Sequence, residues 1–140
     1  MTTDPAPPIL GTLESALYAD DLAAAEDFYG GVLGLKRIQR QEGRHVFFAS
    51  GASMLLIFVP AATRVAAAAA IRVPVHGASG PGHYCFSVEP EALDRWRTYL
   101  PGKGIEIEAE ITWPNGARSI YVRDPAGNSV EFAEPGLWAR

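Results

Sequence analysis

The sequence is poor in cysteine and in clustered positive charge, and both shortages exclude classes of function. Cys85 is the only cysteine among 140 residues, so no disulfide can form within the chain and a metal site built from cysteines alone is excluded. The net charge is −4, and the Lys and Arg residues form no cluster or stripe. Because nucleic-acid binding needs a basic face to neutralise phosphates, we expect no nucleic-acid partner.

Long apolar runs are also missing. No stretch approaches the roughly 20 apolar residues that a transmembrane helix needs, and residues 1–8 are acidic and proline-rich rather than signal-like. We therefore expect a cytoplasmic protein without a membrane partner. The hydrophobic fraction of 48% and the charged fraction of 20% are typical of a globular protein, and the length suits a single domain over residues 1–140.

What the sequence does contain is an internal repeat of one strand, one helix and three strands. In the first half the apolar patterns predict a strand at Leu13–Ala19, a helix at Leu22–Leu33, and strands at Lys36–Gln41, Arg44–Ala49 and Met54–Val59. In the second half they predict a strand at His83–Val88, a helix at Glu91–Leu100, and strands at Ile105–Ile111, Ser119–Arg123 and Ser129–Ala133. This order predicts an α+β fold of two tandem βαβββ modules, about residues 11–60 and 83–135, joined by a connector at 61–82 whose alanines favour a short helix.

The alternation of side chains along the strands indicates which residues share a face. Glu14 lies on the same face as Ala16 and Tyr18, opposite Leu17. Glu131 stands between two residues that need burial, so its carboxylate should point to the other face of its strand. A buried carboxylate is costly without a cation, a hydrogen-bond donor or water, so Glu131 should either have such a partner or face solvent on an amphipathic strand.

Three strings carry a family resemblance: LYADDLAAAEDFYGGVLGLK (Leu17–Lys36), GHYCFSVEP (Gly82–Pro90) and SIYVRDPAGNSVEF (Ser119–Phe132). They resemble the opening, the second-module strand and the closing hairpin of the vicinal oxygen chelate superfamily, which includes glyoxalases, bleomycin-resistance proteins and extradiol dioxygenases. The resemblance implies that the modules form an open barrel around a central cavity that binds a small molecule. It also implies a homodimer, because exposed sheet edges can be covered by pairing between subunits.

The resemblance further implies metal ligands at four positions, of which Glu14, His83 and Glu131 can ligate and Leu56 cannot. Leucine in place of the glyoxalase I acid argues against the hemithioacetal isomerase reaction. One histidine with two carboxylates suits Mn²⁺ or Fe²⁺ best, with Ni²⁺, Zn²⁺ and Mg²⁺ as alternatives. By the same resemblance, Glu131 and Tyr121 are the expected catalytic residues. The residues expected to line the substrate cavity are Phe48, Leu56, Trp113 and Tyr121, although packing into the hydrophobic core is an equal alternative for Phe48 and Trp113.

Two functions from different classes remain open at this point. The first is a glyoxalase- or dioxygenase-like metalloenzyme, of dioxygenase or lyase type, in which a divalent metal chelates a small oxygenated substrate. The second is a metal-free binding module, like the bleomycin-resistance proteins, that sequesters a drug in an acidic, aromatic-lined cavity. The pair His83 and Glu131 favours the enzyme, because sequestration needs neither residue. A catalytically silent member of the family is a third reading.

Overall fold

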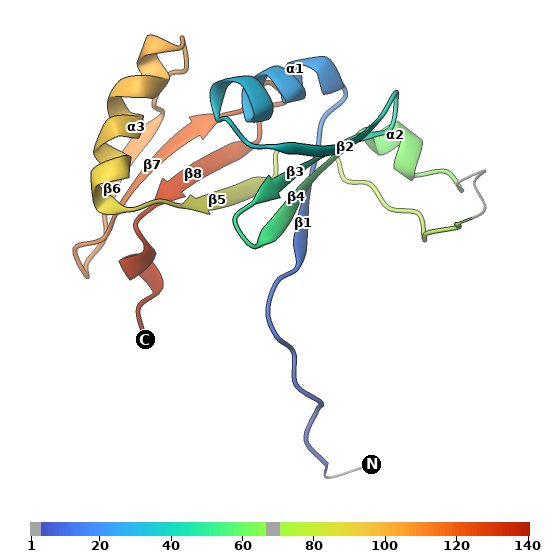
Figure 1. Ribbon diagram of the computed structural model, residues 1–140, viewed down its shortest axis with the longest axis horizontal. Coiled ribbons are helices and arrows are strands. Elements are labelled where there is room, and N and C mark those ends of the chain that lie inside the picture. Colours follow the sequence, from blue (N-terminus) through green and yellow to red (C-terminus); the bar gives the residue numbers. More distant parts are fainter. Residues whose placement is uncertain (1–3, 67–70) are drawn as a thin grey trace.

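The chain forms two four-stranded sheets, each with helices on one face (Figure 1). The computed structural model describes residues 4–66 and 71–140. The first unit comprises β1 (Glu14–Tyr18), α1 (Leu22–Glu26), the π-helix η1 (Asp27–Val32), β2 (Arg37–Gln41), β3 (His45–Ser50) and β4 (Ser53–Phe58). After a short helix α2 (Pro60–Thr63), the second unit comprises β5 (His83–Ser87), α3 (Pro90–Gly102), β6 (Ala109–Thr112), β7 (Arg118–Arg123) and β8 (Ser129–Ala133), followed by the 3₁₀ turn η2 (Pro135–Trp138).

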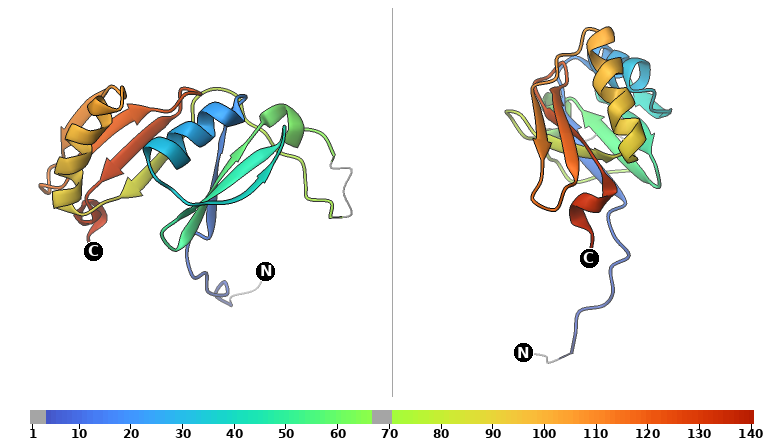
Figure 2. Two further views of the ribbon diagram at one scale, coloured as in Figure 1. Left: turned by 45° about the horizontal axis from the view of Figure 1, so that its top comes forward. Right: turned by 90° about the vertical axis from the view of Figure 1, so that its left-hand side faces the viewer.

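Both sheets have the same topology, which confirms the α+β fold with two βαβββ modules. The strand orders are β1-β4-β3-β2 and β5-β8-β7-β6, with β1–β4 and β5–β8 parallel and the other pairs antiparallel. The register pairs Glu14 with Met54 and His83 with Ser129, so the two residues occupy equivalent positions. The sheets lie side by side and close no barrel, which leaves β1 and β5 as edge strands (Figure 2).

The first helical segment begins where the sequence predicts and then changes its winding. The Asp21 carboxylate caps α1 by accepting a hydrogen bond from the amide of Ala24 at 3.0 Å. After Glu26 the helix continues with π geometry, in which the amide of Leu33 donates to the carbonyl of Phe28 at 2.9 Å. A Cβ at Gly30 would lie 3.3 Å from the ring of Phe48, so glycine lets this helix approach β3 closely.

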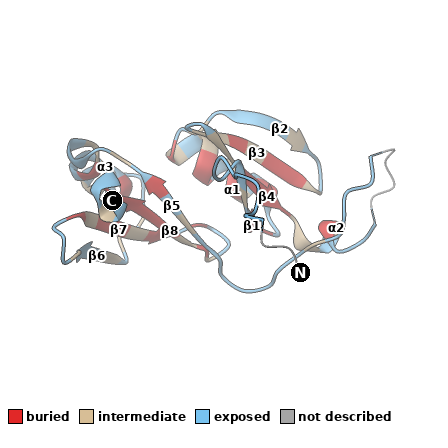
Figure 3. Cartoon of the chain, turned by 90° about the horizontal axis from the view of Figure 1, so that it is seen from below, coloured by how far each residue is buried: buried red, intermediate tan, exposed pale blue. Residues whose placement is uncertain are grey.

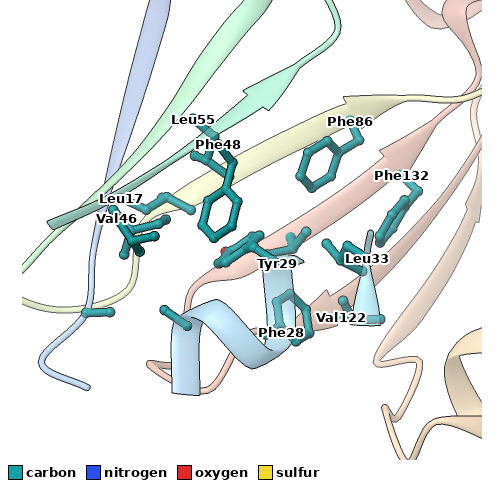
Figure 4. Close-up of a cluster of buried hydrophobic side chains, with 14 of the residues drawn as sticks. Leu17, Phe28, Tyr29, Leu33, Val46, Phe48, Leu55, Phe86, Val122 and Phe132 are labelled. Carbon is teal, nitrogen blue, oxygen red and sulfur yellow. The ribbon is translucent and has the colours of Figure 1, made fainter. Parts of the chain in front are cut away.

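One hydrophobic core joins the two units beneath these helices (Figure 4). Side chains from β3 and β4 meet side chains from β5, β7 and β8, and residues of α1 and η1 fill the space between them. The inner strands carry most of the buried residues, while β2 and β6 are largely exposed or intermediate (Figure 3). The core therefore occupies the helix-covered face of each sheet and leaves the other face open.

Three segments differ from the sequence prediction. The strand expected at Ile105–Ile111 begins only at Ala109, because the amide of Ile105 instead donates to the carbonyl of Leu100 at the end of α3. The helix expected in the connector is limited to α2 within the described residues, and residues 67–70 lie outside them. Phe48 lies in the core and not on an open face. None of the helices in residues 4–66 and 71–140 is long and apolar enough to span a membrane.

Candidate functional site

The polar and aromatic residues of the second unit gather in a pocket on the open face of its sheet. The pocket has a volume of about 520 Å³ and lies against β5, β7, β8, the turn after β6, and η2. It is lined by His83, Cys85, Trp113, Pro114, Asn115, Tyr121, Glu131, Leu137 and Trp138. Four residues predicted from the sequence therefore lie together here: His83, Trp113, Tyr121 and Glu131.

His83 and Glu131 face each other in this pocket with different exposures. The Nε2 atom of His83 lies 3.3 Å from Oε1 of Glu131, and the side chains are 54% and 7% exposed, respectively. The Nδ1 atom of His83 lies 3.1 Å from the carbonyl oxygen of Ser129. A carbonyl oxygen can only accept a hydrogen bond, so Nδ1 carries a proton and donates it. In the neutral ring, Nε2 then presents a lone pair towards the carboxylate.

The second oxygen of Glu131 is held from the side away from His83. The Ser119 hydroxyl donates to Oε2 of Glu131 at 2.6 Å, and the Trp113 indole Nε1 donates to the Ser119 hydroxyl at 2.8 Å. Ser119 and Glu131 are both buried. The carboxylate thus has a fixed inner oxygen and an outer oxygen directed at His83.

Two further groups beside Glu131 hold their protons at neutral pH. Desolvation, followed by hydrogen bonding to Glu131, raises the pKa of the Tyr121 hydroxyl to about 12. Desolvation by the surrounding residues, followed by the charge of Glu131, raises the pKa of the Cys85 thiol to about 12. The Tyr121 ring lies 6.3 Å from the His83 ring at an interplanar angle of 25°. Tyr121 therefore remains a hydrogen-bond donor beside Glu131, and Cys85 is a poor nucleophile there.

The structure does not bring the third expected ligand to this pair within one chain. Glu14 is exposed at the start of β1, on the other sheet, and no three His, Cys, Asp or Glu side chains converge among residues 4–66 and 71–140. Leu56 lies on the open face of the first sheet and is mostly buried, between Ala16 and Phe47 in the register. The expected set of Glu14, His83 and Glu131 is therefore divided between the two sheets.

Phe48 differs most clearly from its expected place in a substrate cavity. It is fully buried on the helix-covered face of β3, and its ring centroid lies 6.1 Å from that of Tyr29. The alternation along β3 explains the difference, because Phe47 and Phe48 point to opposite faces and only Phe47 shares the face of Leu56. Phe48 contributes to the hydrophobic core.

Several residues of the pocket were not found from the sequence. Trp138 and Leu137 belong to η2, which is tied to the pocket because Nδ2 of Asn115 donates to the carbonyls of Gly136 and Leu137 at 3.1 and 3.2 Å. No strand or helix periodicity predicts such a turn. Ser119 could have been found, since it alternates with Tyr121 on the same face of β7.

The comparisons with known proteins place this chain in a family. A family model described as Glyoxalase/Bleomycin resistance protein/Dioxygenase superfamily matches residues 11–132. The chain belongs to this superfamily. A search of the curated proteins found no match.

Solved structures extend the superfamily assignment. The chain is 46% identical to a lactoylglutathione lyase from Agrobacterium tumefaciens, over 96% of this chain and 100% of that chain, with a TM-score of 0.89. It is 23% identical to a glyoxalase/bleomycin resistance protein/dioxygenase from Nocardioides, over 94% of this chain and 86% of that chain, with a TM-score of 0.71. A glyoxalase/dioxygenase from Nostoc punctiforme is 21% identical, over 95% and 97% of the two chains, with a TM-score of 0.67. At these lower identities the likeness shows the glyoxalase-superfamily fold alone.

Proposed function

We propose that this glyoxalase-superfamily protein is a metal-dependent enzyme whose His83 and Glu131 hold a divalent cation that chelates a small oxygenated substrate. The observation that supports the proposal is the contact between Nε2 of His83 and Oε1 of Glu131 at 3.3 Å. With Nδ1 donating to the Ser129 carbonyl, Nε2 is the ring nitrogen left to take up a proton or a metal ion, and it faces a carboxylate oxygen. Only a proton or a metal cation between them makes this arrangement favourable.

The two donors fit a metal ion in separation and chemistry. Two ligands at right angles, each roughly 2.1 Å from a metal, lie roughly 3 Å apart, close to the separation of these atoms. The buried carboxylate supplies charge, and the exposed imidazole leaves an entry path from the pocket. A nitrogen and carboxylate oxygens suit Mn²⁺ or Fe²⁺. A bound cation would polarise the oxygens of the chelated substrate, and the protonated Tyr121 would orient one of them by hydrogen bonding.

We further propose that a second copy of the chain completes the ligand set with its own Glu14. Glu14 is exposed, at the position of β1 equivalent to that of His83 in β5, and both strands have a free edge. A dimer that brings β1 of one copy to β5 of the other would cover these edges and close the pocket with the open face of the first sheet. Such a dimer would explain why Glu14 lies on a different sheet from His83 and Glu131 within one chain.

The reaction within the superfamily is narrowed by Leu56. The Agrobacterium relative is named a lactoylglutathione lyase. Leu56 occupies the position equivalent to Glu131, but it can neither ligate a cation nor carry a proton. We therefore propose a reaction that needs a carboxylate at Glu131 but none at Leu56. Its substrate would supply two oxygens of its own to the cation.

Titration calorimetry with Mn²⁺ and, under anaerobic conditions, Fe²⁺ tests the metal site. We expect binding by the wild-type protein, loss of most binding in His83→Ala and Glu131→Ala, and a smaller loss in Glu14→Ala. Glu91→Ala is a matched control, because Glu91 is exposed in the first turn of α3, away from the open faces of both sheets. Wild-type binding no stronger than that of His83→Ala would reject the proposal. Turnover of the methylglyoxal–glutathione hemithioacetal would show that Leu56 does not exclude the isomerase reaction. The proposed metal site would stand in that case.

A metal-free binding module is the second candidate, and the composition of the pocket favours it. Trp113, Tyr121 and the exposed Trp138 offer aromatic faces around the acidic Glu131, which suits a flat cationic drug. If the protein binds no divalent metal but quenching of its tryptophan fluorescence shows tight binding of bleomycin, sequestration replaces the enzyme as the proposed function.

A further inference from the structure

A chain of hydrogen bonds links the Trp113 indole to the Glu131 carboxylate through Ser119. The indole N–H donates to the Ser119 hydroxyl at 2.8 Å, and this hydroxyl donates to Oε2 of Glu131 at 2.6 Å. The direction is fixed at both ends, because an indole N–H can only donate and an ionised carboxylate can only accept. The Ser119 hydroxyl therefore uses its one proton on Glu131 and accepts the indole proton.

The turn between β6 and β7 holds Trp113, the first donor in this series of hydrogen bonds, in place. The backbone amide of Trp113 donates to the carbonyl of Ala117 at 2.8 Å, and the amide of Gly116 donates to the carbonyl of Trp113 at 2.8 Å. Asn115 accepts a bond from the amide of Ala117 through its side chain at 3.1 Å. The indole thus projects from a tightly bonded turn towards Ser119, which is 1% exposed.

The consequence is that the two oxygens of Glu131 are not interchangeable. Oε2 is occupied by Ser119, whereas Oε1 faces Nε2 of His83. Turning the carboxylate to offer both oxygens to one cation would break a charged, buried hydrogen bond, which is unfavourable. It would also leave the Ser119 hydroxyl without its acceptor.

From this geometry we infer that Ser119 and Trp113 are positioning residues that make Glu131 a single-oxygen ligand. The inference rests on the proposed cation at His83 and Glu131. A carboxylate that binds through both oxygens occupies two coordination positions, so holding Oε2 back keeps one more position free. Two adjacent free positions are what a substrate needs in order to chelate through two oxygens. This series of hydrogen bonds from Trp113 through Ser119 to Glu131, the relay, therefore leaves the cation with one additional position for the chelating substrate.

The relay can be tested first without any metal. In an NMR spectrum of the protein with ¹⁵N-labelled tryptophan, Trp113→Phe identifies the indole N–H resonance of Trp113. We expect Glu131→Gln and Ser119→Ala each to shift this resonance, because both remove the charge-assisted bond that polarises the hydroxyl. Ser87→Ala is the matched control, since Ser87 is exposed on β5, on the face of His83 and Cys85. An unmoved resonance in Glu131→Gln would overturn the relay.

Co²⁺ titration, followed by visible absorption, then tests the positioning role. We expect Ser119→Ala to lower Co²⁺ affinity about 10–100-fold and to change the absorption spectrum of the bound ion, as losses of outer-shell hydrogen bonds do. Ser119→Thr keeps the hydroxyl and should restore both the affinity and the spectrum, and Ser87→Ala should match the wild type. Ser119→Ala with wild-type affinity and spectrum would overturn the inference and leave the metal site intact. If the wild-type protein binds no Co²⁺, the proposed function fails, and the tryptophan resonance alone decides whether the relay exists.

Discussion

The Tyr29 hydroxyl donates a hydrogen bond to Oδ2 of Asp124 at 2.7 Å and so connects η1 to the turn between β7 and β8. Asp124 also accepts bonds from the amides of Ala126 and Asn128 and from the Asn128 side chain. Asn128 in turn donates to the carbonyl of Tyr18 at 3.1 Å. A polar network thus joins the two units beside the shared core. Burial and the charge of Asp124 raise the pKa of Tyr29, which keeps the donor protonated.

Tyr29→Phe should destabilise the fold by about 2 kcal/mol, because it removes a buried hydrogen bond to a charged acceptor. The free energy of urea-induced unfolding measures the effect. Tyr99→Phe is the control, since the Tyr99 hydroxyl donates to the carbonyl of Val32 at the surface and its loss should cost less than about 1 kcal/mol. Equal losses in the two variants would contradict a special role for the Tyr29–Asp124 bond.

His45 gives the stability of the fold a defined dependence on pH. It is buried against Phe47, its Nε2 contacts Oε1 of Gln39 at 2.9 Å, and its Nδ1 has no hydrogen-bond partner among the described residues. Burial and the nearby charge of Arg44 lower the pKa of His45 in the folded state. The unfolded chain therefore takes up a proton at a higher pH than the folded chain.

The sign of the effect follows from that difference. The contribution of neutral His45 to stability is fully present above the unfolded pKa of about 6.5 and is lost as the pH falls from there towards the folded pKa. We expect the difference in unfolding free energy between the wild type and His45→Asn to shrink as the pH falls from 7 to 5, in urea titrations at each pH. Parallel curves for the two proteins would contradict a lowered pKa.

The repeat and the alternation of side chains predicted most of the fold and half of the site. Strand periodicity, which depends only on local sequence, placed Leu17 towards the helix and turned Glu131 away from the buried face of β8. His83 and the pocket as a site were expected only from the family resemblance. The repeat and the alternation failed at Phe48, where two adjacent aromatic residues on β3 both suit a cavity and only the register decides which one enters the core. They also could not show that Glu14 and His83 do not converge within one chain, because this depends on how the two units pack together.

Leu56→Glu should tighten metal binding, since it adds a carboxylate at the position equivalent to Glu131. Leu56→Gln is the matched control with the same shape and no charge. Because Leu56 is mostly buried, both variants should lose about 1–3 kcal/mol of stability without metal. Thermal unfolding with and without Mn²⁺ measures both effects, and only Leu56→Glu should recover stability beyond the wild-type gain. An equal response of Leu56→Gln would exclude Leu56 from the surroundings of the metal.

The shared metal site can be tested by mixing two damaged subunits. If Glu14 of one copy completes the site of the other, a dimer of one Glu14→Ala chain and one Glu131→Ala chain has one intact site and one site that lacks both carboxylates. Random exchange makes about half of the dimers mixed, so about a quarter of all sites should regain wild-type Mn²⁺ affinity.

Calorimetry after co-refolding the two variants measures this recovery, with each variant refolded alone as the control. Sedimentation of the wild type must show a dimer at the same concentration. This experiment distinguishes a site within one subunit from a site shared between two. If the site lies within one subunit, every subunit in the mixture lacks a ligand, and we expect no recovery of Mn²⁺ binding at any mixing ratio. Recovery that rises and falls with the fraction of mixed dimers therefore requires Glu14 to act across the subunit boundary.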